Sequence, residues 1–234
     1  MRTSVSPAEI TALCGLAYRG DVLEVGTAWG YAAIMMAQKG ARHVMTVDPH
    51  KPHDSNELAA GTCEAAQELA RYYGVADRVT IVQERADELL PRLRGNMYAP
   101  GAKFDLVFID GDHSVGAARH DLLWGTWLVR AGGFVACHDY GPDGIAGVNE
   151  AFNEVFPDGP SIRVDTLGVV QVWPHAGEGA APLWCPGSGR SRSRSPAPWG
   201  SVTAATPTRA RCRSPRVRTG GRHRRRRLLA GTRR

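Results

Sequence analysis

The chain has 234 residues, enough for one α/β domain with a sizeable core. Its formal net charge of +6 conceals a sharp division, because the segment 175–234 contains 15 arginines and one acid. The first 174 residues therefore carry 14 basic and 22 acidic side chains, a net charge of −8. Such an acidic segment offers no obvious basic groove, which argues against nucleic acid as a partner of the folded part.

Apolar runs and cysteines narrow the class of protein further. No stretch approaches the roughly 18 apolar residues of a membrane-spanning helix, and the amino terminus lacks the apolar core of a signal peptide. The five cysteines are scattered without a CxxC pair, which is typical of free thiols in a reducing compartment. We therefore expect a cytoplasmic protein with no membrane partner.

Helix caps, apolar periodicity and glycine or proline breaks predict helices and strands that alternate along residues 1–174. The first helix begins with Ser6 as its cap, Pro7 in its first turn and Glu9 three residues after the cap. The predicted helices cover 6–20, 31–39, 54–74, 86–93, 114–129 and 148–156. The predicted strands cover 21–25, 44–47, 79–82, 104–109, 133–137, 162–164 and 168–173. We expect an α/β fold, a Rossmann-like, doubly wound, mostly parallel seven-stranded sheet with an antiparallel closing strand.

A glycine turn after the first predicted strand is typical of a nucleotide-binding half-sheet. Gly26 and Gly30 let the backbone approach a ligand closely, and the helix that follows offers free N–H groups. Asp48 ends the next strand, 22 residues after Gly26, where an acid accepts hydrogen bonds from ribose hydroxyls. The turn reads GxxxG and not GxGxxG, with Glu24 two residues before it, which argues against NAD. Tight packing of strand on helix is the alternative explanation of these glycines.

Acids and histidines follow two buried strands in the middle of the chain, at 104–109 and 133–137. A predicted helix crosses between these strands, so they are parallel and their carboxyl ends lie on the edge where ligands bind. Asp110 directly follows the first strand, and His138 and Asp139 follow the second. We expect these side chains to meet in one crevice.

The segment 175–234 has a different composition from the rest of the chain. It is rich in Arg, Pro, Gly, Ser and Ala and cannot bury enough apolar surface to order itself. We divide the chain into a domain at 1–174 and a disordered basic tail at 175–234. An altered reading frame or a non-functional extension explains the tail better than a nucleic-acid-binding arm, which remains the alternative.

Several motifs occur in an order and at spacings that match a known family. They are Glu24-Val-Gly26-Thr-Ala-Trp-Gly30, Val47-Asp48-Pro49, Phe108-Ile-Asp-Gly-Asp-His113, Gly132-Gly133 and His138-Asp-Tyr-Gly141. Together they resemble the class I S-adenosylmethionine-dependent methyltransferases, over roughly residues 8–174. The closer likeness is to the small-molecule O-methyltransferases, which include catechol, macrolide-sugar and cephalosporin-biosynthesis enzymes.

This resemblance implies a site for S-adenosylmethionine on the same motifs. The residues implied are Glu24, Gly26 and Gly30 for the methionine end, with Thr27 in the same turn, Asp48 for the ribose, Arg85, Ala86 and Asp87 for the adenine, and Asp110. The adenine turn departs from the family, whose members usually have Gly-Asp-Ser at this place.

The resemblance also implies a metal site. In the metal-dependent members, carboxylates that match Asp110 and Asp139 bind magnesium, with a third ligand beside the second acid. His138 or Tyr140 stands there in this chain, where relatives have Glu, Asp or Asn. Because magnesium prefers oxygen ligands, this departure leaves Mg²⁺ or a softer divalent cation as alternatives. A place behind the ligands is the alternative role for His138.

The activity implied is transfer of a methyl group from S-adenosylmethionine to a hydroxyl of a small metabolite, assisted by a divalent cation. A cation between Asp110 and Asp139 would lower the pKa of the acceptor hydroxyl. His113 stands where a catechol-type enzyme has its lysine base, so we expect His113 and Asp110 to be catalytic. A helix-capping surface histidine is the alternative for His113.

Other interpretations of the sequence are a nucleotide-dependent oxidoreductase, which the missing GxGxxG disfavours, and a nucleic-acid-binding protein that acts through its tail. Small enzymes of this kind often pair, so a homodimer is among the expectations.

Overall fold

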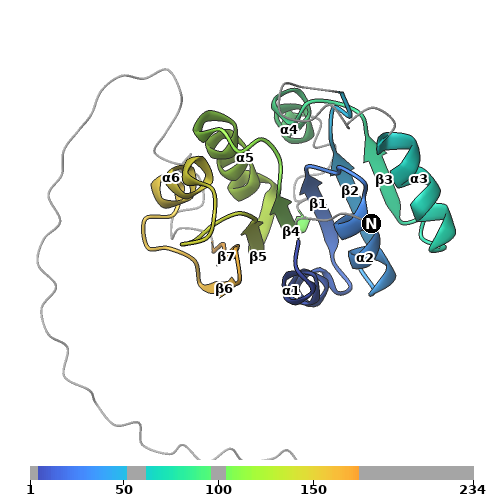
Figure 1. Cartoon of the computed structure of the whole chain (residues 1–234), viewed down its shortest axis with the longest axis horizontal. Coiled ribbons are helices and arrows are strands. Elements are labelled where there is room, and N and C mark those ends of the chain that lie inside the picture. The colour runs from blue at the N-terminus through green and yellow to red at the C-terminus, as the bar shows by residue number, and fades with distance from the viewer. Residues whose placement is uncertain (1–4, 52–61, 96–103, 174–234) are drawn as a thin grey trace, which may run out of the picture. The chain divides into compact units, whose positions relative to one another are not determined.

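The computed structural model describes residues 5–51, 62–95 and 104–173 (Figure 1). The first part of the helix predicted at 54–74 lies outside these ranges. The segment 175–234, with its predicted disorder, lies outside them as well.

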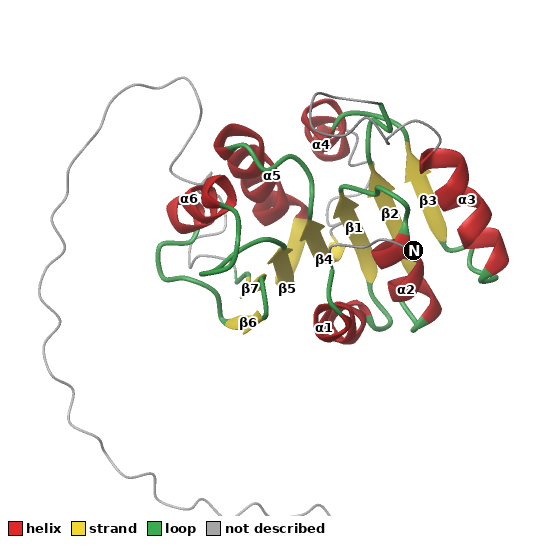
Figure 2. Cartoon of the chain, in the orientation of Figure 1, coloured by secondary structure: helices red, strands yellow, loops and turns green. Residues whose placement is uncertain are grey.

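Helices and strands alternate along the described chain, as the sequence predicts (Figure 2). The helices are α1 (Pro7–Ala17), α2 (Tyr31–Gln38), α3 (Thr62–Tyr72), α4 (Ala86–Gly95), α5 (Val115–Leu128) and α6 (Ala146–Val155). The strands are β1 (Asp21–Val25), β2 (His43–Val47), β3 (Val79–Val82), β4 (Phe104–Ile109), β5 (Val129–Cys137), β6 (Ile162–Val164) and β7 (Leu167–Gln171). The predicted start of α1 is confirmed, since Ser6 and Glu9 form a reciprocal capping box.

The strands form one seven-stranded sheet in the order β3-β2-β1-β4-β5-β7-β6. Strands β1 to β5 pair in parallel, and β7 pairs antiparallel with both β5 and β6. This confirms the Rossmann-like fold with an antiparallel closing strand. The strand order reverses between β1 and β4, and ligands of such sheets bind at the carboxyl ends of the strands on either side of this point.

Two layers of helices cover the sheet (Figure 1). On one face of the sheet, side chains of the central strands such as Val22 and Phe108 pack in the core cluster that includes α1 and α2. On the other face, side chains such as Leu23 and Ile109 pack in the cluster that includes α4, α5 and α6. Side chains alternate between the two faces along a strand, so the first residues after each strand also point to one face or the other.

None of the helices in the described ranges combines the length and the apolar character needed to cross a bilayer.

The aromatic ring of Phe152 is central to the packing of α6 on the sheet. It is fully buried, and its ring centroid lies 4.1 Å from that of Tyr140 and 5.0 Å from that of Phe156. We expect Phe152→Ala to lower the free energy of unfolding by about 3–5 kcal/mol, because it leaves a cavity in the core. Urea denaturation measures this change. Tyr72→Ala, on a ring that is 82% exposed, is the control, with an expected loss below about 1 kcal/mol. Equal losses in the two variants would contradict the assignment of Phe152 to the core.

Candidate active site

The carboxyl ends of the central strands are tied together by backbone hydrogen bonds that continue beyond the sheet. These bonds join Gly26 N to Val47 O (2.9 Å), Asp110 N to Val25 O (2.8 Å) and His138 N to Ile109 O (3.0 Å). The acidic residues predicted at the ends of β1, β2, β4 and β5 therefore lie along one continuous edge.

Gly26 brings the ends of β1 and β4 together. Its φ is +97°, and a Cβ atom at this position would lie 1.9 Å from the carbonyl oxygen of Asp110. No residue with a side chain fits there without moving the backbone. The close approach predicted at this glycine is thus made by the chain itself, which places Asp110 directly beside the glycine turn.

Glu24 is a buried acid behind the glycine turn. Its carboxyl accepts hydrogen bonds from the Thr46 hydroxyl and from the backbone N–H of Ala33, in the first turn of α2. The Thr46 hydroxyl also shares a hydrogen bond of 2.7 Å with the Thr27 hydroxyl, which connects the glycine turn to Glu24. Gly30, the N-cap residue of α2, has no side chain to cap the helix. The Glu24 carboxyl instead accepts a hydrogen bond from one of the free N–H groups in the first turn of α2.

Burial raises the pKa of Glu24 to about 8. The hydrogen bond from Thr46 opposes this rise, whereas the nearby carboxylates of Asp110 and Asp48 add to it. At neutral pH, in the absence of a cationic ligand, Glu24 is therefore mostly protonated.

Asp48 holds the glycine turn from the end of β2. One carboxylate oxygen accepts a hydrogen bond from Ala28 N (3.0 Å), and the other accepts one from His50 N (2.7 Å). Ala28 itself has a positive φ of 44°, so the turn is bent tightly around this carboxylate. Asp48 therefore lies against the glycine turn, with which the sequence motifs grouped it.

The residues predicted to contact adenine lie at the exit of β3. The exposed guanidinium of Arg85 makes two hydrogen bonds of 2.9 Å to the carboxylate of Asp87, and Ala86 begins α4. Arg85 and Asp87 thus pair with each other, next to the end of β2 that carries Asp48.

Asp110, His113 and Asp139 form a group that could hold a metal ion. Each offers one ligand atom, and these atoms all lie within 4.8 Å of one another. The His113 Nε2 atom is 3.0 Å from Oδ2 of Asp139. His113 does not cap α5, because Ser114 is the N-cap residue and its hydroxyl accepts a hydrogen bond from Ala117 N.

The charges in this group are strongly coupled. Hydrogen bonds from His113 and His138 hold the pKa of Asp139 well below its usual range. The same bond to Asp139 raises the pKa of His113, although partial burial opposes the rise. Burial raises the pKa of Asp110, and the hydrogen bond from His138 counteracts it.

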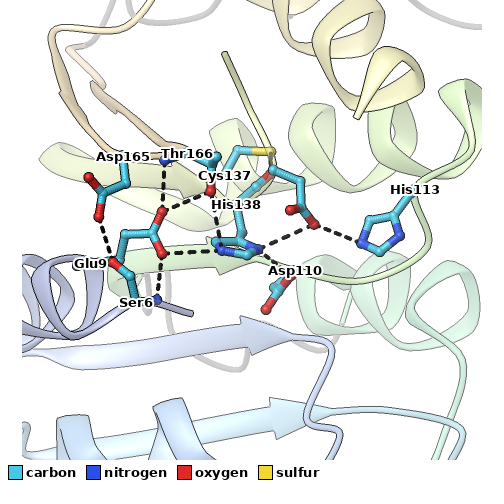
Figure 3. A network of polar contacts seen from close by, with 9 residues as sticks. Ser6, Glu9, Asp110, His113, Cys137, His138, Asp165 and Thr166 are labelled. Carbon is cyan, nitrogen blue, oxygen red and sulfur yellow. Dashed lines mark hydrogen bonds and ion pairs between the residues drawn. The ribbon is translucent and has the colours of Figure 1, made fainter. Parts of the chain in front are cut away.

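His138 lies between Glu9 and Asp110 (Figure 3). Its side chain is 2% exposed, with Nδ1 at 3.1 Å from Asp110 and 3.3 Å from Asp139, and Nε2 at 3.3 Å from Glu9. Burial alone would lower the pKa of His138, but hydrogen bonds to Asp110 and Asp139 outweigh it and raise the pKa to about 10. The candidate ligand group contains His113, whereas His138 contacts its two carboxylates from the buried side.

Sequence reasoning missed Glu9 as a neighbour of this site. The capping box accounted for its residue type, and no local pattern connects it with His138, 129 positions later. The alternation of side chains along β5 could have indicated this contact. His138 lies two residues after Ala136 and is expected to point to the same face of the sheet, where Ala136 packs in the cluster that includes α1.

Comparisons with known proteins support the assignment of the fold. The structure is similar to that of cofactor-bound Rv0187 from MTB, with 25% sequence identity and a TM-score of 0.55, covering 74% of this chain and 83% of that chain. It is also similar to the O-methyltransferase TomG from Streptomyces achromogenes, solved in complex with SAM, with 23% identity and a TM-score of 0.53. That likeness covers 72% of this chain and 82% of TomG. No curated protein matches the sequence.

A family model described as a methyltransferase domain matches residues 23–140, which are 118 of the 234 residues. The match spans the glycine turn, Asp48 and both acids of the candidate metal group. The chain therefore belongs to the methyltransferase-domain family, and its resemblance to the class I S-adenosylmethionine-dependent methyltransferases is confirmed.

Proposed function

We propose that the protein transfers a methyl group from S-adenosylmethionine to a hydroxyl of a small metabolite in the cytoplasm, with the help of a divalent cation. One observation carries this proposal. The candidate ligand group of Asp110, His113 and Asp139 adjoins the glycine turn, since the Asp110 carbonyl packs against Gly26. A methyl donor and a hydroxyl acceptor bound to these two features would be neighbours.

The chemistry of the glycine-turn side fits S-adenosylmethionine. This molecule carries an ammonium group, a positively charged sulfonium and two ribose hydroxyls. Asp48 offers carboxylate oxygens to the hydroxyls, and Glu24 and Asp110 supply acidic groups near the positive charges. The TomG structure, which shares the fold, holds SAM, and this supports the same cofactor here.

The chemistry of the acceptor side fits a divalent cation. Asp110 and Asp139 offer oxygen and His113 offers nitrogen, a set suited to Mn²⁺ and related ions as well as to Mg²⁺. A bound cation would replace the hydrogen bond between His113 Nε2 and Asp139 Oδ2, so His113 would have to be deprotonated at Nε2 to act as a ligand. A bound cation lowers the pKa of a coordinated hydroxyl.

Methyl transfer forms a bond from the acceptor oxygen to the methyl carbon and breaks the bond from carbon to sulfur, which leaves as a neutral thioether. The hydroxyl proton must go to a base. His113 can serve a metal-free version of this chemistry, because Nε2 faces Asp139 and the ring, which is half exposed, leaves Nδ1 to accept a proton. The two versions make different predictions about metal removal.

The first prediction concerns the cofactor. Asp48→Ala should weaken S-adenosylmethionine binding by about 10- to 100-fold, because it removes charged acceptors for the ribose hydroxyls. Calorimetry on the full chain measures the dissociation constant, and NAD should not compete. Asp77→Ala is the matched control, since Asp77 is an exposed acid that precedes β3 at the opposite edge of the sheet. Wild-type affinity in Asp48→Ala would sink the ribose assignment.

The second prediction concerns the metal. Mn²⁺ should bind the wild type, and Asp139→Asn or His113→Gln should raise its dissociation constant at least about tenfold, as loss of a ligand does. Electron paramagnetic resonance detects the bound ion. Exhaustive chelation should abolish methyl transfer, and added Mn²⁺ or Mg²⁺ should restore it. Activity that survives chelation but is lost in His113→Gln would instead establish the metal-free role of His113.

The third prediction concerns Glu24 and pH. Its pKa of about 8 in the folded protein exceeds the ordinary value of 4.5, so the folded state binds this proton more tightly than the unfolded chain. The free energy of unfolding should therefore fall as pH rises from about 4.5 to about 8, by a few kcal/mol from this group.

Glu24→Gln removes that titration while keeping an oxygen for Thr46. Urea denaturation at pH 5.5 and pH 9 should therefore show a smaller loss of stability in Glu24→Gln than in the wild type. Parallel losses in both proteins would contradict a buried, protonated Glu24.

A further inference from the structure

We propose that Glu9 is a positioning residue of this site: it fixes the ring of His138, and that ring in turn holds the two carboxylates that receive the acceptor. This inference rests on the proposed function and extends the site to α1. Glu9 lies outside residues 23–140, which the family model matches.

The carboxylate of Glu9 is buried and fully used. Its Oε2 atom accepts a hydrogen bond from Ser6 N (2.7 Å) and faces His138 Nε2 (3.3 Å). Its Oε1 atom accepts two hydrogen bonds from Thr166, from the backbone N–H and from the hydroxyl, each 2.8 Å long. One side chain therefore joins the start of α1, the β6–β7 turn and the ring of His138 (Figure 3).

Helix capping explains only part of this arrangement. A neutral glutamine can complete a capping box as well as a glutamate. The contact with His138 is different, because both ring nitrogens face carboxylates, and a ring protonated at both nitrogens forms ion pairs on both sides. A buried imidazolium is stabilised by negative partners, and Glu9 is the charged partner of Nε2, beside the neutral Thr166 hydroxyl at 3.4 Å.

His138 transmits this restraint to the candidate ligands. A planar ring held at Nε2 has a fixed direction for Nδ1, which lies 3.1 Å from Asp110 Oδ1 and 3.3 Å from Asp139 Oδ2. Two neighbouring carboxylates repel each other, and the ring between them offsets this repulsion. Without the charge of Glu9, Nε2 keeps only the Thr166 hydroxyl, at 3.4 Å, so the ring loses its anionic anchor on this side and its hold on the two carboxylates is weakened.

The test compares Glu9→Gln with Ser6→Ala in the full chain. Glu9→Gln removes the charge that faces His138. Ser6→Ala removes the hydroxyl that caps α1 and bonds Asp165 (2.7 Å), but it leaves the backbone N–H of Ser6 and the Glu9–His138 contact. Ser6→Ala thus weakens the same helix start without touching the proposed relay, and the melting temperatures of both variants establish that each is folded.

Glu9→Gln should lower kcat about 10- to 100-fold, as misplacement of reacting groups does, and leave the S-adenosylmethionine dissociation constant within about twofold of the wild type. Ser6→Ala should keep kcat within about twofold at a comparable melting temperature. Equal losses of kcat in the two variants, or none in Glu9→Gln, would overturn the proposal.

A double-mutant cycle separates positioning from general destabilisation. If Glu9 acts through His138, Glu9→Gln should have little further effect on kcat in a His138→Asn background. If Glu9 only stabilises the fold, the two losses should multiply, and the proposal fails.

Crystal structures give a readout that does not depend on activity. In Glu9→Gln we expect the His138 ring to turn and Nδ1 to leave hydrogen-bonding distance of Asp110 and Asp139. An unchanged ring would refute the positioning role. A wild type that transfers no methyl group would refute the proposed function, and the crystal structures would still decide the role of Glu9.

Discussion

The carboxyl-terminal edge of the sheet depends on one buried imidazole ring enclosed by three carboxylates. His138 joins Glu9 of α1 to Asp110 after β4 and Asp139 after β5. Each of these charges would be costly to bury alone, and each is compensated by the others. Removing one partner leaves an uncompensated charge, which typically costs about 3–5 kcal/mol in a buried pair. The network therefore fixes the relative positions of elements that are distant in the sequence.

Much of the fold was predictable because local patterns and topology agree. Short apolar runs located the strands of the sheet, and the Ser6–Glu9 box located the start of α1. The crossover rule placed the ends of β4 and β5 on one edge, so the meeting of Asp110 with Asp139 was predictable from sequence alone. These inferences need only the chain direction and the period of each element.

The positions of His113 and His138 were harder to predict. His113 follows an acid and His138 follows a strand, and both lie in motifs that also carry the candidate acids. The structure separates them by backbone direction. His138 points to the same face of the sheet as Ala136, toward α1. Asp139, the next residue, has a φ of +58°, and its carboxylate faces His113. Aspartate is among the residue types enriched at positive φ, but most aspartates do not adopt it, so residue type alone does not predict this turn. The long-range contact of Glu9 was hidden for a similar reason, because its capping role explained it locally.

The acids of this edge are of two electrostatic kinds, and their difference gives the site a direction. Asp139 is already paired with imidazole rings, which keep it ionised. Glu24, on the same edge, has hydrogen bonds but no cationic partner among the residues that the structure describes, and burial keeps it mostly protonated near neutral pH. Environments that push the pKa values of neighbouring acids apart assign them different tasks. A cationic ligand would find its missing negative partner beside the glycine turn, while the acceptor would meet Asp139, which is ionised before the acceptor arrives.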